Sequence, residues 1–242
     1  MELAESIEKA KALIAEASNV CVLTGAGISQ ESGVPTFRGE DGIWKQMRAQ
    51  DLATAEAFYS NPKLVWEWYE SRRELIHNAE PNPGHYALCE LEEKKDGFTL
   101  ITQNIDGFHR KAGSKNVIEI HGNLWQLRCT VTGAVEDNFD VPLKEIPPKF
   151  SATGYMARPN VVWFGEMILA QTVSACLDAI ESCDVMLIVG TSAMVQPAAS
   201  MGVAAKQRNK PVIELNLDPT PNTGLYDVTI QGKSGEVLPL IV

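Results

Sequence analysis

Short apolar runs alternate with amphipathic stretches along most of the chain. The first amphipathic stretch predicts a helix that ends near Ser18, because its apolar residues recur every three or four positions. These residues are Leu3, Ile7, Ala10, Leu13, Ile14 and Ala17. The apolar runs lack polar alternation, which is typical of strands buried on both faces of a parallel sheet. They comprise residues 20–24, 99–102, 117–120, 185–189 and 212–215. The alternation predicts an α/β fold with a doubly wound, Rossmann-like parallel sheet.

Two stretches interrupt this alternation, and we interpret them as insertions that together form a smaller subdomain. Residues 40–80 carry a helical pattern, with Leu64, Trp68 and Leu75 on one stripe. Residues 128–158 are rich in proline and hold no long periodic segment. The length of 242 residues suits one domain. We therefore expect a single domain, 1–242, whose larger part comprises residues 1–39, 81–127 and 159–242.

Composition excludes several classes of protein. The hydrophobic share of 45% and the charged share of 21% are ordinary for a globular protein. No apolar run approaches the roughly 18 to 20 residues that span a bilayer, so we expect no membrane segment. A net charge of −10 opposes binding to nucleic acid or anionic lipid. The first residues resemble neither a secretory signal nor a transit peptide, and the five dispersed cysteines favour reduced thiols, so we expect a cytoplasmic protein.

Polar and glycine-rich segments follow the predicted strands, at the sheet edge where open α/β folds bind ligands. The segment 25–29, Gly-Ala-Gly-Ile-Ser, is either a phosphate-binding turn or a plain tight turn, since Gln30 stands where a dinucleotide fingerprint needs glycine. The residues after the next strand, Gln103, Asn104 and Asp106, suit a ribose or a carboxamide, or a polar turn with local bonding. His121, at a strand end, is either a general base or a structural histidine.

These blocks, taken in order, resemble the sirtuins. The resemblance rests on GAGIS, ESGVPTFRG, TQNID with His109, His121-Gly122, VVWFGE at 161–166, Gly190-Thr191-Ser192 and Asn216, and it extends from about residue 20 to Ser234. It implies an NAD-dependent protein lysine deacylase that consumes NAD, acts on acylated lysine side chains, and releases nicotinamide and an O-acyl-ADP-ribose. His77 and His85 match no such motif and are interpreted as structural.

The resemblance also implies roles for individual residues. His121 becomes the general base, and Asn104 lies with Asp106 in the nicotinamide pocket. The implied NAD contacts are Gly25, Ala26, Gly27, Ser29, Glu31, Thr36, Phe37, Arg38, Gln103, Asn104, Ile105, Asp106, Gly190, Thr191, Ser192, Asn216, Asp218 and Ser234. The implied substrate-binding edge consists of Val162, Phe164, Gly165 and Glu166, along which a peptide adds as a strand.

A further pair of residues bears on the acyl group. Tyr69 and Arg72 are three apart on a predicted helix and project from one face; taken alone, such a pair is usually a partly buried ring and a solvated charge. They match the pair that marks sirtuins acting on acidic acyl groups, and Ala53 falls where that class keeps a small residue. A guanidinium binds a carboxylate as a fork. We therefore expect desuccinylase and demalonylase activity above deacetylase activity.

The second insertion departs from the family pattern. Most sirtuins carry four cysteines there for a structural zinc, whereas the matching positions here are Cys129, Thr132, Phe150 and Thr153. Because threonine is a poor zinc ligand and phenylalanine is none, we expect no zinc and a module held by an apolar core around Phe150.

The alternatives to a deacylase are a mono-ADP-ribosyltransferase, a non-catalytic NAD or ADP-ribose sensor, and a hydride-transfer dehydrogenase. The sequence leaves the oligomeric state open.

Overall fold

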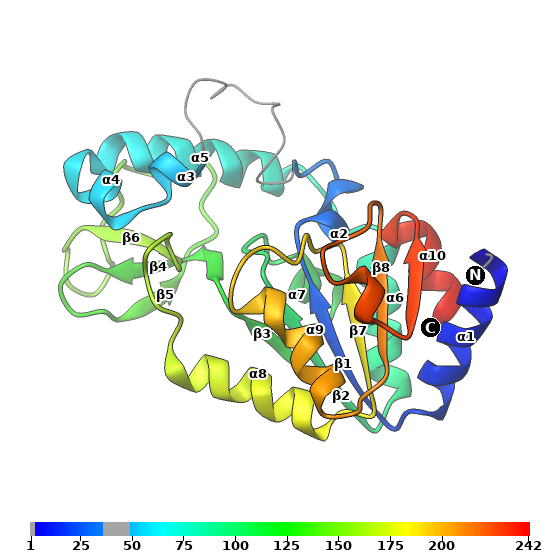
Figure 1. The fold of residues 1–242 in the computed structure, drawn as a ribbon. Coiled ribbons are helices and arrows are strands. Elements are labelled where there is room, and N and C mark those ends of the chain that lie inside the picture. Colours follow the sequence, from blue (N-terminus) through cyan, green and yellow to red (C-terminus); the bar gives the residue numbers. More distant parts are fainter. Residues whose placement is uncertain (1–2, 36–48) are drawn as a thin grey trace.

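The larger part of the molecule is built on a six-stranded parallel sheet (Figure 1). The computed structural model describes residues 3–35 and 49–242. Strand order is β3-β2-β1-β7-β8-β9. The strands are β1 (Asn19–Thr24), β2 (Gly97–Thr102), β3 (Val117–Glu119), β7 (Val185–Val189), β8 (Val212–Asn216) and β9 (Val228–Gln231). The predicted fold class is confirmed, and the five predicted runs all form strands of this sheet. Sequence analysis missed β9, a short edge strand with polar alternation.

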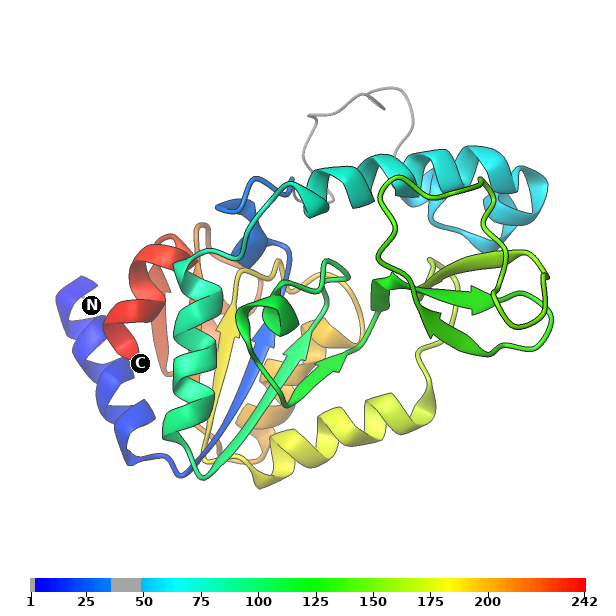
Figure 2. The same ribbon diagram turned by 180° about the vertical axis from the view of Figure 1, so that it is seen from behind.

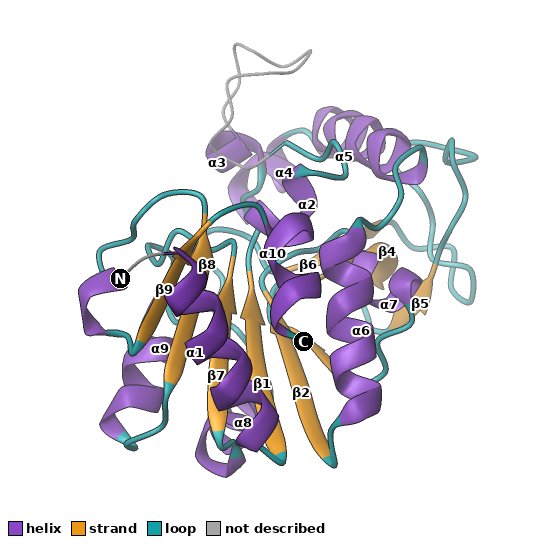
Figure 3. Ribbon diagram, turned by 90° about the vertical axis from the view of Figure 1, so that its right-hand side faces the viewer, coloured by secondary structure: helices purple, strands orange, loops and turns teal. Residues whose placement is uncertain are grey.

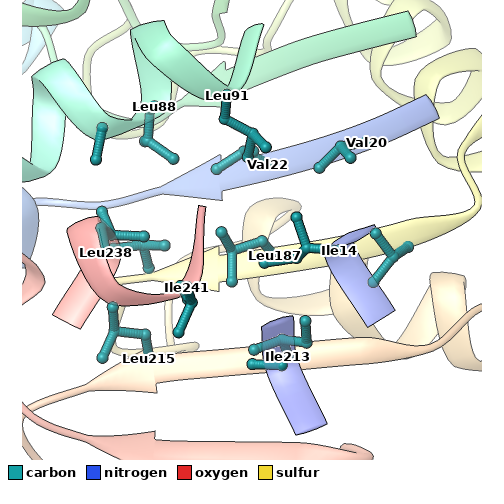
Figure 4. Close-up of a cluster of buried hydrophobic side chains, with 14 of the residues drawn as sticks. Ile14, Val20, Val22, Leu88, Leu91, Leu187, Ile213, Leu215, Leu238 and Ile241 are labelled. Atoms are coloured by element: carbon teal, nitrogen blue, oxygen red, sulfur yellow. The ribbon is translucent and has the colours of Figure 1, made fainter. Parts of the chain in front are cut away.

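Helices cover both faces of this sheet (Figure 3). The first face carries α1 (Leu3–Glu16), α6 (Pro83–Lys94) and α10 (Ser234–Ile241). Their apolar side chains pack on alternate residues of the central strands, such as Val22, Leu187 and Ile213 (Figure 4). The second face carries α8 (Ala170–Ser182) and α9 (Ala198–Gln207), against which the intervening strand residues pack. Burial on both faces is the reason why these strands read as continuous apolar runs.

The smaller part combines helices with an antiparallel sheet. The helices are α3 (Ala49–Leu52), α4 (Ala55–Ser60) and α5 (Pro62–His77), and the strands are β4 (Gly122–Cys129), β5 (Val135–Asp137) and β6 (Ala157–Val161). Sheet order is β5-β4-β6. Because β4 begins at Gly122 and β6 ends at Val161, the small sheet extends beyond the insertion expected at 128–158. Figure 2 shows α5 lying along this part, joined to the large sheet through α6.

The buried face of α5 differs from the expected stripe. Leu75 is 40% exposed, so its assignment to the apolar stripe was wrong. The face that packs on the small sheet instead holds bulkier side chains, including Trp66, Trp68 and Tyr69. It also holds Arg73, which is fully buried and which a hydropathy pattern assigns to solvent.

Arg73 joins α5 to the small sheet through hydrogen bonds to main-chain carbonyls. Its guanidinium donates to the carbonyl oxygens of Leu124 at 2.7 Å, Asn138 at 2.9 Å and Asp140 at 3.0 Å, and to Asn138 Oδ1 at 2.7 Å. It also lies 3.7 Å from the Glu70 carboxylate. These bonds satisfy the two terminal nitrogens of the buried guanidinium, whereas Nε has no hydrogen-bond partner among the described residues and faces the Glu70 carboxylate only at ion-pair distance. Arg73 therefore fixes the position of α5 above β4.

The remaining short helices are α2 (Gly27–Gln30), α7 (Phe108–Ala112) and the 3-10 turn η1 (Thr223–Leu225). Within the described residues, no helix is both long enough and apolar enough to cross a bilayer.

Substitution of Gly122, where β4 begins against β6, tests the packing at the junction between the two parts. Its φ is +80°, and a Cβ there would lie 2.0 Å from the carbonyl oxygen of Asn160 on β6. We expect Gly122→Ala to lower the free energy of unfolding by about 3 kcal/mol or more, because backbone strain and a backbone clash add. Gly154→Ala is the matched control: its φ is +70° with nothing within 4 Å, so strain alone applies, about 1 kcal/mol. Urea unfolding measures both, and equal losses would contradict the clash.

Candidate active site

The carboxyl ends of β1, β2, β7 and β8 meet at one edge of the large sheet (Figure 1). The order in which successive strands are added to the sheet reverses between β1 and β7. From β1 the chain adds β2 and β3 on one side, and it then returns to add β7, β8 and β9 on the other. Ligands of open α/β sheets bind at such a switch point. The structure brings together there the predicted segments 25–29, 103–106 and 190–192.

The glycines after β1 pack against the loop after β7. Gly27 N donates to Gly190 O at 2.8 Å, and Gly25 N donates to Val189 O at 3.0 Å. A Cβ on Gly27 would lie 2.7 Å from the Gly190 Cα, and Gly190 itself has φ +60°. These glycines therefore permit two backbones to touch, and the Gly27 N–H is already used within the protein. The phosphate-turn interpretation of the sequence does not apply to that N–H.

Side-chain amides join the loops of three strands. Gln103, after β2, donates from Nε2 to Thr191 Oγ1 at 2.8 Å, and Asn216 Nδ2 at the end of β8 donates to Thr191 O at 3.0 Å. Thr191 follows β7 and is 7% exposed. Because Thr191 is bonded from both sides, the order of polar groups along this edge is fixed.

His121 is held in one tautomer by its neighbour. Its Nδ1 lies 3.0 Å from the carbonyl oxygen of Gln103, which accepts, so the hydrogen is on Nδ1 and Nε2 carries a lone pair. Burial lowers the pKa of His121 below its usual value, against the smaller opposite effect of the Gln103 bond. The ring is therefore neutral at pH 7, which is the form a general base requires.

A buried polar network lies beside this edge and centres on Ser29. The Ser29 hydroxyl donates to Asp106 Oδ2 at 2.7 Å and accepts from Asn104 Nδ2 at 3.1 Å. Asp106 Oδ1 accepts from Phe108 N at 2.9 Å. Burial raises the pKa of Asp106 while these two hydrogen bonds lower it. Each group restrains the next, so the network sets the orientation of the Asn104 amide.

Sequence analysis missed the part that His85 plays in this network. Its Nδ1 accepts from Asn82 N at 3.2 Å, forming a capping box at the start of α6, and Nε2 lies 3.4 Å from Ser29 Oγ. His85 is fully buried, and burial lowers its pKa to about 4. The capping sequence Asn82-Pro83 was a usable signal for the helix start, but the contact with Ser29 is tertiary.

The other predicted NAD contacts fall in different settings. Glu31 Oε2 accepts from Gly235 N at 2.7 Å, next to buried Ser234 at the start of α10. Ile105 O accepts from Leu124 N at 2.9 Å. Ser192 and Asp218 are exposed. Thr36, Phe37 and Arg38 lie outside the described residues.

The predicted substrate edge bridges the two parts of the molecule. Val162 N donates to His121 O at 2.8 Å, and Phe164 N donates to Ala53 O at 2.9 Å. Phe164 and Gly165 are exposed, whereas the Glu166 carboxylate is engaged by Arg158 at 2.6 Å and 2.8 Å. The main chain of this segment is therefore placed between His121 and the Ala53 loop, and the Glu166 side chain is part of the protein's own structure.

Tyr69 and Arg72 are both turned inward on α5. Tyr69 is 2% exposed, and its hydroxyl oxygen accepts from Trp163 Nε1 at 2.9 Å. Arg72 is half-buried, with its guanidinium carbon 5.0 Å from the centroid of the Trp68 ring. Desolvation lowers the pKa of Arg72, and the neighbouring Tyr69 opposes this. The interpretation of this pair as an ordinary solvated charge and half-buried ring does not describe these positions.

The four positions matching the family's zinc ligands lie in the small sheet's apolar core or at its border. Phe150 and Cys129 are buried in the cluster that includes Leu127 and Trp66. Cys129 Sγ accepts from Thr132 N at 3.5 Å and lies 3.8 Å from Thr153 Oγ1. Among the residues that the structure describes, no three His, Cys, Asp or Glu side chains come together to hold a metal. This donor set does not fit a tetrahedral zinc site.

Comparison with known proteins identifies the family of this fold and site. The model of the Sir2 family matches residues 25–197. The chain belongs to the Sir2 family. It is 49% identical to an NAD-dependent protein deacylase of Aquifex aeolicus, over 89% of this chain and 90% of that protein. A second NAD-dependent protein deacylase, from Pyrobaculum aerophilum, is 47% identical over 95% of this chain and 92% of its own length.

Solved structures agree with this membership. A Sir2 homologue crystallised with NAD superposes with a TM-score of 0.92 at 45% identity, covering 97% of this chain and 92% of that one. A Sir2 protein bound to a deacetylated p53 peptide and 3′-O-acetyl ADP ribose superposes with a TM-score of 0.86 at 30% identity, covering 100% of this chain and 97% of that one. The sirtuin resemblance is confirmed, and with it the enzyme class, an NAD-dependent protein deacylase.

His85, which packs against the also buried His109, predicts acid sensitivity. Its pKa in the folded state, about 4, lies below the ordinary 6.5, so the unfolded chain binds more protons between these values. The contribution of His85 to the free energy of unfolding is therefore fully present above pH 6.5 and is lost as the pH falls toward 4. The loss amounts to at most about 3 kcal/mol. Urea unfolding at pH 7, 6, 5 and 4 should show this slope, and His85→Gln should reduce it, leaving the part due to His109, whose pKa burial also lowers. Exposed His77→Gln is the control; a slope unchanged by His85→Gln would contradict the assignment.

Proposed function

We propose that this Sir2 protein removes succinyl and malonyl groups from protein lysine side chains faster than it removes acetyl groups. The observation that carries this proposal is the inward position of Tyr69 and Arg72 on α5. A guanidinium in a partly desolvated site gains from a carboxylate partner, since the carboxylate favours its charged form. A charge-assisted bond of this kind contributes roughly 1.5 to 3 kcal/mol, or about ten- to a hundredfold in preference.

The residues at the sheet edge fit the chemistry that NAD supplies as co-substrate, a ribose carbon that loses nicotinamide and accepts the acyl oxygen. Asn104, oriented by Ser29, and Asp106 line the proposed nicotinamide pocket. His121 presents a neutral ring whose Nε2 lone pair takes a proton from a ribose hydroxyl. The main chain of Val162, Phe164 and Gly165 binds the substrate peptide as an added strand.

Arg72→Met tests the acyl preference. We expect the wild type to favour succinyl- and malonyl-lysine peptides over the acetyl peptide by about tenfold or more in kcat/KM. Arg72→Met should invert that order, because it removes the carboxylate partner and leaves an apolar side chain. Mass spectrometry of deacylated peptide and released nicotinamide measures both.

Two control variants separate the acyl preference from the deacylation reaction. Arg72→Lys keeps a charge but not the fork, and should retain only part of the preference. His121→Ala should abolish removal of all acyl groups alike. A preference that survives Arg72→Met would sink the assignment. Covalently ADP-ribosylated protein in place of a soluble O-acyl-ADP-ribose would favour the transferase alternative, and NAD binding without turnover would favour the sensor.

We also propose that the small sheet is stable without zinc. Phe150, 5% exposed within an apolar cluster, supports this, since it supplies packing where the family supplies a metal ligand. Elemental analysis of the purified protein should find well below one zinc per chain, and a chelator should leave the melting temperature unchanged. Phe150→Ala should cost about 3 to 5 kcal/mol in unfolding free energy. Stoichiometric zinc would refute the proposal.

A cytoplasmic location stays a prediction.

A further inference from the structure

Trp163 lies directly against the hydroxyl of Tyr69. The indole is 2% exposed, and its Nε1 donates to Tyr69 Oη at 2.9 Å. The guanidinium carbon of Arg158 lies 3.4 Å from the centroid of the indole, and the Phe58 ring lies 5.0 Å away at 40°. A cation and an aromatic ring thus contact the same indole, and both contacts favour one ring position.

Arg158 is itself fixed by Glu166. Its two terminal nitrogens donate to the two carboxylate oxygens at 2.6 Å and 2.8 Å, and Nη2 donates to Val161 O at 2.9 Å. The same carboxylate accepts from the backbone N of Trp163 at 2.9 Å. One carboxylate therefore holds both the main chain of Trp163 and the cation stacked on its ring. The direction of the indole N–H is set by this arrangement.

The direction of that N–H restricts the Tyr69 hydroxyl. Because an indole nitrogen can only donate, the Tyr69 oxygen must accept, and the hydroxyl hydrogen points away from Trp163. The Tyr69 ring is held edge-on to Trp68, with centroids 4.6 Å apart at 72°. Trp68 also contacts the guanidinium of Arg72, at 5.0 Å. Trp68 and Trp163 together hold the phenol and the guanidinium as one unit.

We propose that Trp163 is a positioning residue for the binding of carboxylate-bearing acyl groups, because it occupies the acceptor side of the Tyr69 hydroxyl and turns the hydroxyl hydrogen away from the indole, available to an acyl carboxylate. Arg158 and Glu166 support it by fixing the indole. This inference rests on the proposed acyl preference and adds a residue that touches neither the acyl group nor the reacting atoms.

Trp163→Phe tests the inference, because it removes the N–H and keeps an aromatic ring against Arg158 and Phe58. We expect kcat/KM for the succinyl peptide to fall about fivefold, mainly through KM, the effect of one neutral hydrogen bond. Activity on the acetyl peptide should fall less, so that the ratio of succinyl to acetyl activity decreases. Trp66→Phe is the matched control: Trp66 is also fully buried and donates to a carbonyl, Ala157 O at 2.9 Å. Its ring lies edge-on to the Tyr69 ring, with centroids 6.3 Å apart, but it makes no hydrogen bond to the Tyr69 hydroxyl. It should leave the ratio of succinyl to acetyl activity unchanged.

A double-mutant cycle with Tyr69→Phe separates positioning from general packing. If Trp163 acts through the phenol, Trp163→Phe causes no further loss of succinyl preference once the hydroxyl is gone. Equal losses on both peptides, or a further loss of preference in the Tyr69→Phe background, would overturn the inference. If Arg72→Met inverts the acyl preference while Trp163→Phe leaves the wild-type preference intact, only the positioning role of Trp163 fails. Should Arg72→Met keep the preference, the proposed function fails and this inference with it.

Discussion

The contact between the loop after β1 and the loop after β7 is the constraint on which the active site depends. Gly27 and Gly190 meet backbone to backbone at the switch point of the sheet, with an N–H to carbonyl distance of 2.8 Å. That contact fixes Ser29, two residues after Gly27, and Thr191, the residue after Gly190. Through Ser29 it reaches Asn104 and Asp106, and through Thr191 it reaches Gln103, whose carbonyl sets the tautomer of His121.

Hydrogen bonding within the site follows from its burial. Asn104 and Asp106 are 8% and 6% exposed, and buried polar groups without partners cost free energy. The protein meets this cost with neutral partners, the Ser29 hydroxyl and the Phe108 main-chain N–H, rather than with a counter-charge. Neutral donors stabilise the Asp106 carboxylate without cancelling its negative charge, which suits the proposed binding of a cationic nicotinamide ring nearby.

Much of the fold was predictable because parallel strands buried on both faces give the plain apolar runs seen at 185–189 and 212–215. The site positions at strand ends were predictable for the same reason, since order along the chain fixes which loops share an edge. Contacts between distant segments were not. Nothing in the local pattern assigns Arg73 to the interior, moves Leu75 to the surface, or bonds His85 to Ser29, because each depends on what packs opposite.

The net charge of −10 and the proposed preference for acidic acyl groups are compatible because they act over different distances. At physiological ionic strength the screening length is about 8 Å, so the overall charge has little effect inside a site bounded by protein. There, contact decides: Arg72 is partly desolvated, its neighbours are the aromatic Trp68 and the phenol of Tyr69, and Glu166 is already paired with Arg158. Glu166 is paired with Arg158 and with the main chain of Trp163, whose indole bonds the Tyr69 hydroxyl. The ion pair thus offsets one negative charge on the segment that lies against Tyr69.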